Sequence, residues 1–353
     1  RMVVLNAIAA RDKGANIMTR TRCSDAKRVG DIWEVTLNDN ITGGKQLVKT
    51  KALVNAAGPW VTSIFDEALK KPSPKKIRLI KGSHIIVPRI HNESQAYILQ
   101  NEDKRIVFVI PYENDFSLIG TTDIEHIGDP ATACISKEET DYLISVVNDH
   151  FKHQISNKDI IATYSGVRPL LDDESDSPAA VTRDYTFEVD APKGKAPLLS
   201  VFGGKITTYR KLSEAAVNGI IDHFPDAGEC ITADTALPGG DFDNQHNLQT
   251  SLQHQYSWLP CQIIKRYVRS YGTLSHKILA GINSLEGMGE YFGAGLYQRE
   301  VEYLIQQEWA VDLEDIIWRR SKLSLHLTAK EKSGLAHFIV TFNSSKKVTS
   351  TSE

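Results

Sequence analysis

The first half of the chain consists of short runs in which apolar and β-branched residues alternate with polar ones, a pattern typical of strands. Between residues 79 and 121 four such runs follow one another with no helical pattern between them, which predicts an antiparallel sheet. The predicted strands cover residues 15–22, 32–37, 52–57, 79–87, 96–99, 105–111, 116–121, 163–167, 181–189 and 198–202.

Helical periodicity marks the start, the middle and the end of the chain. Residues 1–13 and 207–224 predict helices, and Ser136 with Glu139 three residues later forms a capping box that opens another. After the turn-forming segment LPGGD, strand signals stop, and six helices are predicted at 248–255, 260–271, 274–282, 298–308, 313–323 and 328–342. The fold class is therefore α+β, with a mixed domain at 1–236, an all-α domain at 237–343 and a polar tail at 344–353 that we expect to be disordered.

Composition excludes several classes of protein. The formal net charge of the 353 residues is −3 and the pI is near 6.4, so no strong basic field predicts nucleic-acid binding. The four cysteines are scattered, which indicates reduced thiols and no disulfide framework or zinc site. No apolar run approaches the ~20 residues of a membrane span, and we expect no signal peptide. Because the helical pattern begins at Arg1 without a cap, we expect the chain to be the later part of a longer protein.

Candidate chemistry concentrates between residues 163 and 212. Arg168, Arg183 and Lys205 lie near backbone turns, and Gly203-Gly204 precedes a helix whose N-terminus favours negative charge. An arginine holds phosphate or carboxylate in a bidentate fork, but either arginine could instead pair with the acidic residues at 172–176. Lys205 could likewise be a surface lysine at a helix start. Ile206 stands where a P-loop needs Ser or Thr, so a nucleoside triphosphate site is excluded.

Two further segments permit a chemical or a structural interpretation. In KALVNAAGPW (51–60), Ala57-Gly58 would allow a flat cofactor to approach the backbone closely, or simply form a tight strand-to-helix turn. His84 lies in an otherwise apolar strand. It could act as a general base near neutral pH or be a satisfied core residue.

Several long segments of this chain closely resemble the aerobic, FAD-dependent sn-glycerol-3-phosphate dehydrogenases of bacteria. They are RLIKGSHIIVP (78–88), YILQNEDKRIVFVIPY (97–112), LIGTTDIE (118–125), SGVRPLLDDESDSP (165–178), TRDYT (182–186), LLSVFGGKITTYRKL (198–212) and EWAVDLEDIIWRRSKL (308–323). The resemblance implies a DAO-type FAD-dependent oxidoreductase domain with a large, mostly antiparallel sheet, followed by a helical C-terminal domain. The family's strand–G-x-G-x-x-G–helix unit, which holds the ADP part of FAD, is not in this sequence, so we expect the isolated chain to be inactive.

The same resemblance assigns roles to individual residues. Ala57, Gly58 and Trp60 would form a flavin-contacting turn, and Gly203, Gly204, Lys205 and Thr207 would border the isoalloxazine ring. The substrate phosphate would be held by Arg168, Arg183 and Lys205. His84 would take the proton of the C2 hydroxyl while Arg168 polarises its oxygen.

The implied reaction is oxidation of sn-glycerol 3-phosphate to dihydroxyacetone phosphate, with hydride transfer to FAD and electrons passed to ubiquinone or menaquinone. The implied location is cytoplasmic, with peripheral attachment to the inner face of the cell membrane. Membrane contact could involve Lys265, Arg266, Arg269, Arg319 and Arg320, although a solvated helix face explains these cations equally well. A homodimer is left open. The alternatives are a related flavin oxidase that uses oxygen or an amino-acid substrate, and a non-catalytic fragment with an interaction role.

Overall fold

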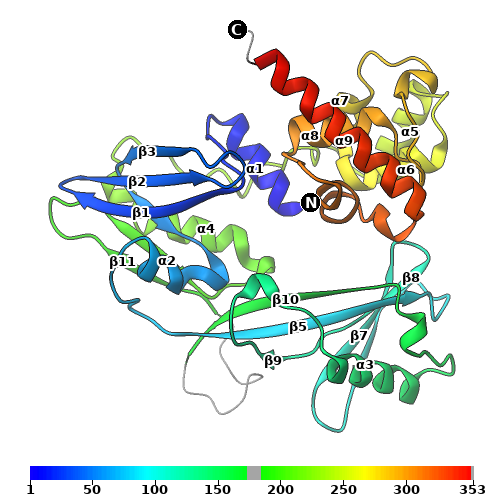
Figure 1. Ribbon diagram of the computed structural model, residues 1–353, viewed down its shortest axis with the longest axis horizontal. Coiled ribbons are helices and arrows are strands. Elements are labelled where there is room, and N and C mark those ends of the chain that lie inside the picture. The colour runs from blue at the N-terminus through cyan, green and yellow to red at the C-terminus, as the bar shows by residue number, and fades with distance from the viewer. Residues whose placement is uncertain (173–183, 351–353) are drawn as a thin grey trace. The chain divides into compact units, whose positions relative to one another are not determined.

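The computed structural model describes residues 1–172 and 184–350, and these fall into two compact units (Figure 1). The β-rich unit is Arg20–Ala233, and the helical unit combines Arg1–Thr19 with the chain from Asp234 onward. The break after residue 233 lies close to the predicted boundary after 236. Residues 1–19, which the sequence pattern assigns to the first domain, pack with the helical unit. The reason is that the Arg1 guanidinium pairs with the buried carboxylate of Glu308, and Leu5 packs against the helical core.

The largest sheet of the β-rich unit has six strands, all in antiparallel pairs, in the order β10-β5-β8-β7-β6, with the short β9 also paired to β5. The long strands β5 and β10 run side by side through most of their length (Figure 1). The strands are β5 (Ile77–Pro88), β6 (Tyr97–Gln100), β7 (Ile106–Tyr112), β8 (Phe116–Gly120), β9 (Ile124–Glu125) and β10 (Ala162–Leu171).

The two faces of this sheet differ because successive side chains of a strand point to opposite sides. One face is apolar and packs on α3 (Lys137–His150), where Leu143, Val146 and Val147 meet side chains from the strands, including Ile85 and Ile119. The Ser136–Glu139 capping box that opens α3 is present as predicted. The opposite face carries His84 and Arg168.

Two three-stranded sheets complete the β-rich unit. In the first, β1 (Thr21–Val29), β2 (Ile32–Asp39) and β3 (Lys45–Thr50) are antiparallel. In the second, β12 (Leu198–Phe202) lies between β11 (Thr186–Asp190) and β4 (Leu53–Asn55), and its pairing with β4 is parallel. Besides α3, this unit contains the helices α2 (Val61–Glu67) and α4 (Tyr209–Asn218). Trp33, Phe65 and Phe202 form the centre of the core that joins the two sheets.

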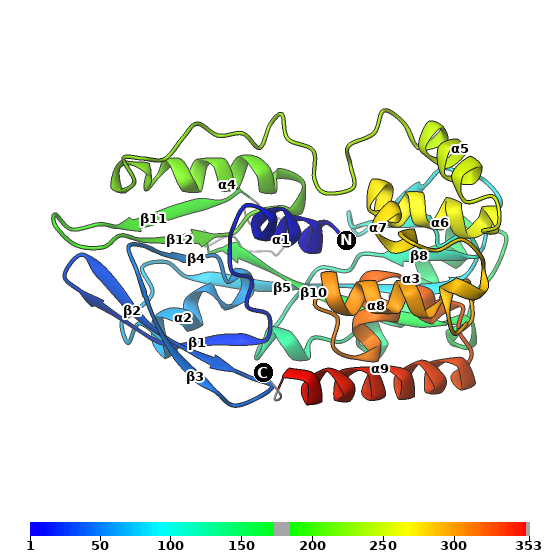
Figure 2. The ribbon, with the colours of Figure 1, turned by 90° about the horizontal axis from the view of Figure 1, so that it is seen from above.

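The helical unit contains α1 (Met2–Asp12), α5 (Gln245–Gln255), α6 (Cys261–Tyr271), α7 (Ser275–Leu279), α8 (Gln298–Gln307), a π-helical turn (Asp315–Arg320) and α9 (Ala329–Ser350), which Figure 2 shows as one long helix. Its core includes an ion pair between Arg266 and the fully buried Glu300, both donor–acceptor distances being 2.6 Å. Among the described residues, no helix is both long enough and apolar enough to span a bilayer.

Two predictions about the ends of elements are wrong. Residues 15–20 are not part of a strand, and β1 begins only at Thr21. The tail 344–353 was predicted to be disordered, but α9 continues through it as far as Ser350. Residues 351–353 lie outside the described residues. Hydrogen bonds from Asn343 to the Val311 carbonyl and from Ser344 to the Val340 carbonyl accompany this continuation.

Candidate functional site

The register of three strands places the predicted site residues on one face of the large sheet. On β5, His84 pairs with Tyr164 of β10 on one side and with Gly120 of β8 on the other. Arg168 lies four residues from Tyr164 on the same strand, so both side chains project to the same face as His84. His84 and Arg168 therefore share a surface, a relationship that the sequence spacing alone does not give.

The imidazole of His84 lies between Tyr164 and Gly120. Its ring is parallel to the Tyr164 ring, with 4.6 Å between centroids and 3° between planes. A Cβ added at Gly120 would overlap the imidazole, so glycine is what allows the ring to lie there. Its Nδ1 is buried, and no described residue is hydrogen-bonded to it. Burial and then the nearby Arg168 cation lower the pKa of His84 from 6.5 to about 4, so the ring is neutral at physiological pH.

Arg168 is held by an ion pair that the sequence did not predict. Its Nη1 donates to Asp123, in the segment that follows β8. Of the acidic residues at 172–176 considered as alternatives, 173–176 lie outside the described residues. Its Nη2 lies 3.0 Å from the position that a Cβ on Gly82 would occupy. The guanidinium therefore lies above Gly82, only two residues along β5 from His84, and its side chain is 37% exposed.

A buried carboxylate joins the strands on the opposite face. Glu139, at the start of α3, accepts hydrogen bonds from Ser83 (2.8 Å), Thr122 (2.6 Å) and the Ser136 amide (2.8 Å), and it pairs with the Lys81 ammonium at 2.8 Å. Burial opposes ionisation of Glu139, but the bonds from Lys81, Thr122 and Ser136 outweigh it and lower its pKa. Ser83 also bonds Ser165 of β10, at 2.9 Å. The network thus fixes the two strands at the positions next to His84 and Tyr164.

The turn after β4 opens onto a cavity of about 1160 Å³. The cavity is lined by Ala57, Pro59 and Trp60 from this turn, and its other walls include Cys23 and Asp129. Gly58 has a φ of +56°, so the turn requires a residue that tolerates the left-handed region. A volume of this size is large enough to hold a substantial part of a cofactor.

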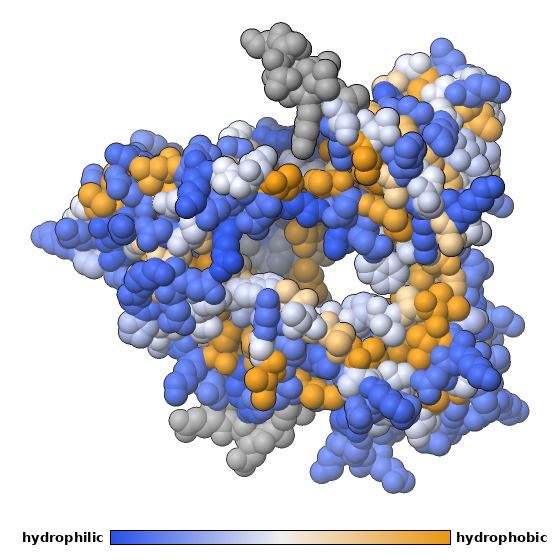
Figure 3. All heavy atoms as spheres, in the orientation of Figure 1, coloured by the Kyte–Doolittle hydropathy of each residue, from blue (hydrophilic) through white to orange (hydrophobic). Residues whose placement is uncertain are grey.

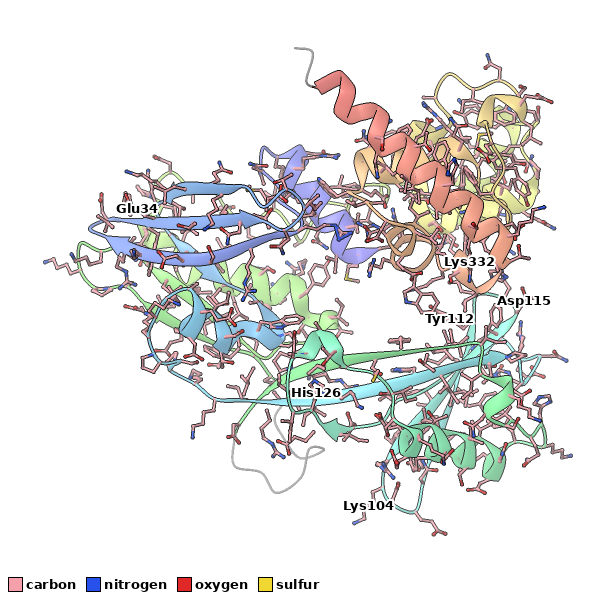
Figure 4. The ribbon with its side chains drawn as sticks, viewed as in Figure 1. Glu34, Lys104, Tyr112, Asp115, His126 and Lys332 are labelled. Atoms are coloured by element: carbon pink, nitrogen blue, oxygen red, sulfur yellow. The ribbon has the colours of Figure 1, made fainter. Side chains whose placement is uncertain are left out.

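Trp60 lines this cavity and is held in place by a hydrogen bond. Its side chain is 42% exposed, and its indole N–H donates to the Asp129 carboxylate at 3.1 Å. The Ala131 amide and then the Trp60 indole lower the pKa of Asp129 by donating to its ionised form. His126, labelled in Figure 4, lies in the same segment, where its backbone amide donates to the Leu79 carbonyl of β5. The cavity wall is therefore joined to the strand that carries His84.

The diglycine turn has a structural requirement as well as an exposed cation. Gly203 and Gly204 have φ values of +77° and +108°, and side chains there would collide with the Asp184 carbonyl and with Leu212. Lys205 and Thr207 follow in the 3₁₀ turn that leads into α4. Lys205 is half-exposed and lies 3.8 Å from the exposed Asp184, a pair of little energetic weight.

The structure brings only some of the predicted residues together. His84 and Arg168 share one face of the sheet, and Ala57 and Trp60 share the cavity. Within residues 1–172 and 184–350, no hydrogen bond or ion pair joins Lys205 to His84 or Arg168. Arg183 lies outside the described residues. The sequence did not single out Tyr164, Gly120 or Asp123, because only the strand register reveals their positions.

The cations considered for membrane contact are largely engaged inside the helical unit. Arg266 pairs with the buried Glu300, while Arg319 and Arg320 both bond Asp315, at 3.0 and 2.9 Å. Arg266 and Arg320 are 14% and 11% exposed at their side chains, so they do not form an open basic surface. Lys265, by contrast, is exposed. More generally, hydrophilic residues predominate on the face of the molecule shown in Figure 3.

Comparison with known proteins defines the class of protein to which this fold and site belong. Residues 1–210 match the family model described as FAD dependent oxidoreductase, and residues 230–344 match the one described as the C-terminal domain of alpha-glycerophosphate oxidase. The structure resembles that of a glycerol-3-phosphate dehydrogenase from Bacillus halodurans complexed with FAD. The TM-score is 0.79 at 22% identity, and the match covers 97% of this chain and 72% of the other, which establishes a common fold.

Sequence identity to curated relatives shows to which family within this class the chain belongs. The chain is 51% identical to a glycerol-3-phosphate dehydrogenase of Pseudomonas aeruginosa over 96% of its length and 66% of the relative. It is 47% identical to the aerobic glycerol-3-phosphate dehydrogenase of Escherichia coli (97% and 68%) and 43% identical to a D-erythritol 1-phosphate dehydrogenase of Brucella abortus (96% and 68%). The chain thus spans about two thirds of the length of these relatives. It belongs to the family of FAD-dependent oxidoreductases that includes the aerobic glycerol-3-phosphate dehydrogenases.

Proposed function

We propose that this chain forms the substrate-binding part of an enzyme that oxidises sn-glycerol 3-phosphate to dihydroxyacetone phosphate with FAD. The observation that carries this proposal is the placement of His84 and Arg168 on one face of the large sheet. A neutral imidazole next to a fixed guanidinium suits a substrate that presents a hydroxyl at one end and a phosphate at the other.

Each side chain has a distinct task in this reaction. Arg168, oriented by Asp123, binds anionic oxygen of the substrate, and Arg183 and Lys205 supply further positive charge to the phosphate. His84, neutral before substrate binds, accepts the proton of the C2 hydroxyl. Burial and then the Arg168 cation lower the pKa of His84, and a dianionic phosphate next to Arg168 offsets the second of these contributions, which favours proton uptake by the imidazole.

The chain offers positions that fit FAD. The cavity beside Trp60 is bounded by Ala57 and Pro59, and the left-handed Gly58 between them shapes the turn. The turn of Gly203, Gly204, Lys205 and Thr207 presents the start of α4, whose free amides favour negative charge. When bound, FAD supplies the acceptor for the hydride from C2 and passes the two electrons onward.

The electron acceptor in this proposal is a membrane quinone, ubiquinone or menaquinone, which the protein reaches by peripheral contact with the inner face of the cell membrane. The aerobic relative and the long sequence matches to that family support this part of the proposal. A vesicle sedimentation assay tests the contact. Binding to vesicles of anionic lipid supports it, whereas recovery of all the protein in the supernatant contradicts it.

Anaerobic stopped-flow spectroscopy of the FAD-loaded enzyme, of which this chain forms the substrate-binding part, tests the reaction itself. We expect sn-glycerol 3-phosphate to bleach the flavin absorbance much faster than glycerol, which lacks the phosphate. D-Erythritol 1-phosphate is the second candidate substrate because one relative at 43% identity acts on it, so it is compared in the same assay. Reoxidation by a soluble quinone should outpace reoxidation by oxygen. Equal reduction by glycerol and by the phosphate ester would contradict the proposal.

A further inference from the structure

Two glycines face each other between the His84 and Arg168 positions of the large sheet. Gly82 of β5 pairs with Gly166 of β10, with the His84–Tyr164 pair on one side and the Ile80–Arg168 pair on the other. Both glycines belong to the same sheet face as His84, because Gly82 is two positions from His84 on β5 and Gly166 is two positions from its partner Tyr164 on β10. The space above them therefore lies directly between the candidate base and the candidate phosphate ligand.

The two glycines differ in why they lack a side chain. A Cβ at Gly82 would come within 2.6 Å of the Thr121 hydroxyl and 3.0 Å of Arg168 Nη2, so the fold itself requires glycine there. A Cβ at Gly166 would meet no atom of any described residue within 4 Å, and Gly166 is not in the left-handed region of φ. Neither packing nor backbone conformation among the described residues requires glycine at 166.

A glycine inside a strand weakens the strand, and it often marks a place where a ligand approaches the backbone. Gly166 is exposed and lies in the middle of a ten-residue strand. We propose that Gly166 forms the floor of the substrate site next to the Arg168 guanidinium, and that it sets the room available to the carbon chain of a small, unbranched polyol phosphate. This inference rests on the proposed function and adds a specificity-determining residue to it.

The spacing fits a short substrate. Two residues of a strand span roughly 7 Å, which separates the His84 position from Gly82, and the Arg168 guanidinium lies above Gly82. A phosphate bound by Arg168 therefore places a hydroxyl only two or three bonds from the ester oxygen next to His84. The intervening carbons lie over Gly166, beside the guanidinium above Gly82, and a side chain at position 166 would occupy their space.

The substitution Gly166→Ala tests this floor, because its Cβ has space in the described structure and the fold should tolerate it. We expect the KM for sn-glycerol 3-phosphate and the dissociation constant of dihydroxyacetone phosphate, measured by calorimetry on the oxidised FAD-loaded protein, to rise about tenfold or more. Gly166→Val should raise both further. The thermal midpoint of Gly166→Ala should not fall. Gly228→Ala is the matched control, since Gly228 is also exposed, has an ordinary φ and has open space around its Cβ.

The proposed function and the role of Gly166 are contradicted by different results. If the wild-type flavin is not reduced by sn-glycerol 3-phosphate, the proposed function is contradicted. If the wild type is reduced but Gly166→Ala binds dihydroxyacetone phosphate as tightly as Gly228→Ala does, the floor is contradicted and the function stands. An equal loss of binding in both alanine variants would also overturn the floor, because the effect would not depend on position.

Discussion

The Tyr164 ring lies parallel to the His84 imidazole, with 4.6 Å between their centroids and 3° between their planes. The two residues face each other across the β5–β10 pair, so the stack follows from the strand register. One face of the imidazole is covered by Tyr164, and Gly120 lies against the ring from β8. Tyr164 therefore covers one face of the ring and contributes to its burial.

Replacing Tyr164 with leucine should raise the pKa of His84 from about 4 toward its ordinary value of 6.5, because water then reaches the open face of the ring. Tyr164→Phe keeps the aromatic ring and should leave the pKa of His84 near that of the wild type. Titration of the His84 ring signals by NMR measures both values. Equal pKa values in the leucine and phenylalanine variants would show that the stack does not control the imidazole.

His84 should also make the folded protein sensitive to mild acid. Its pKa is lower in the folded chain than its unfolded value, so between pH 6.5 and about 4 the unfolded chain binds a proton that the folded chain does not. The contribution of neutral His84 to stability is therefore present above pH 6.5 and is lost as the pH falls through this window. His84→Gln should lose less unfolding free energy than the wild type between pH 7 and 4.5.

Urea unfolding at the two pH values measures this difference. His153→Gln, at an exposed position, is the matched control and should behave as the wild type does. A wild-type acid dependence in the His84→Gln variant would mean that His84 does not titrate abnormally in the folded chain.

The Glu139 carboxylate should be important for stability. Glu139→Gln keeps the shape of the side chain but leaves the Lys81 ammonium, which is 12% exposed, without its counter-charge. Breaking a buried pair in this way costs about 3–5 kcal/mol of unfolding free energy. Removing both charges in Lys81→Met/Glu139→Gln should recover part of that loss. Denaturant unfolding of the three variants measures the coupling, and strictly additive losses would argue against an ion pair.

Arg183 remains a prediction from the sequence, since it lies outside the described residues. If Arg183 binds the substrate phosphate, Arg183→Ala should raise the KM for sn-glycerol 3-phosphate while leaving the flavin content of the purified protein unchanged. Steady-state kinetics with an artificial electron acceptor and the ratio of flavin to protein absorbance give the two values. An unchanged KM would remove Arg183 from the site.

The sequence predicts the large sheet well because its strands bear strong apolar patterns. Residues 79–87, for example, fall within β5, and the Ser136–Glu139 capping box opens α3 as expected. The sequence missed β3, whose residues are mostly exposed, and most of β1, where Ser24, Asp25 and Lys27 obscure the alternation of apolar positions. Strands stabilised mainly by their neighbours leave little hydrophobic signal of their own.

The candidate site was predicted only in part, for a related reason. Residue type and local pattern were enough to single out His84 and Arg168. The roles of Tyr164, Gly120 and Asp123 depend on which strands pair and in what register, and this information is not local in the sequence. The same limit applies to Arg266 and Arg320. The sequence pattern groups both with a basic surface. In the structure Arg266 pairs with Glu300 of α8, and Arg320 pairs with Asp315 at the other end of the π-helical turn.

The central claim is that His84 accepts the proton of the C2 hydroxyl, while the phosphate is bound by other residues. Anaerobic stopped-flow reduction of the FAD-loaded His84→Ala variant by sn-glycerol 3-phosphate tests this most directly. Loss of a general base should slow the limiting reduction rate by roughly 100-fold or more, while the dissociation constant of dihydroxyacetone phosphate changes little. A limiting rate equal to that of the wild type would contradict the account.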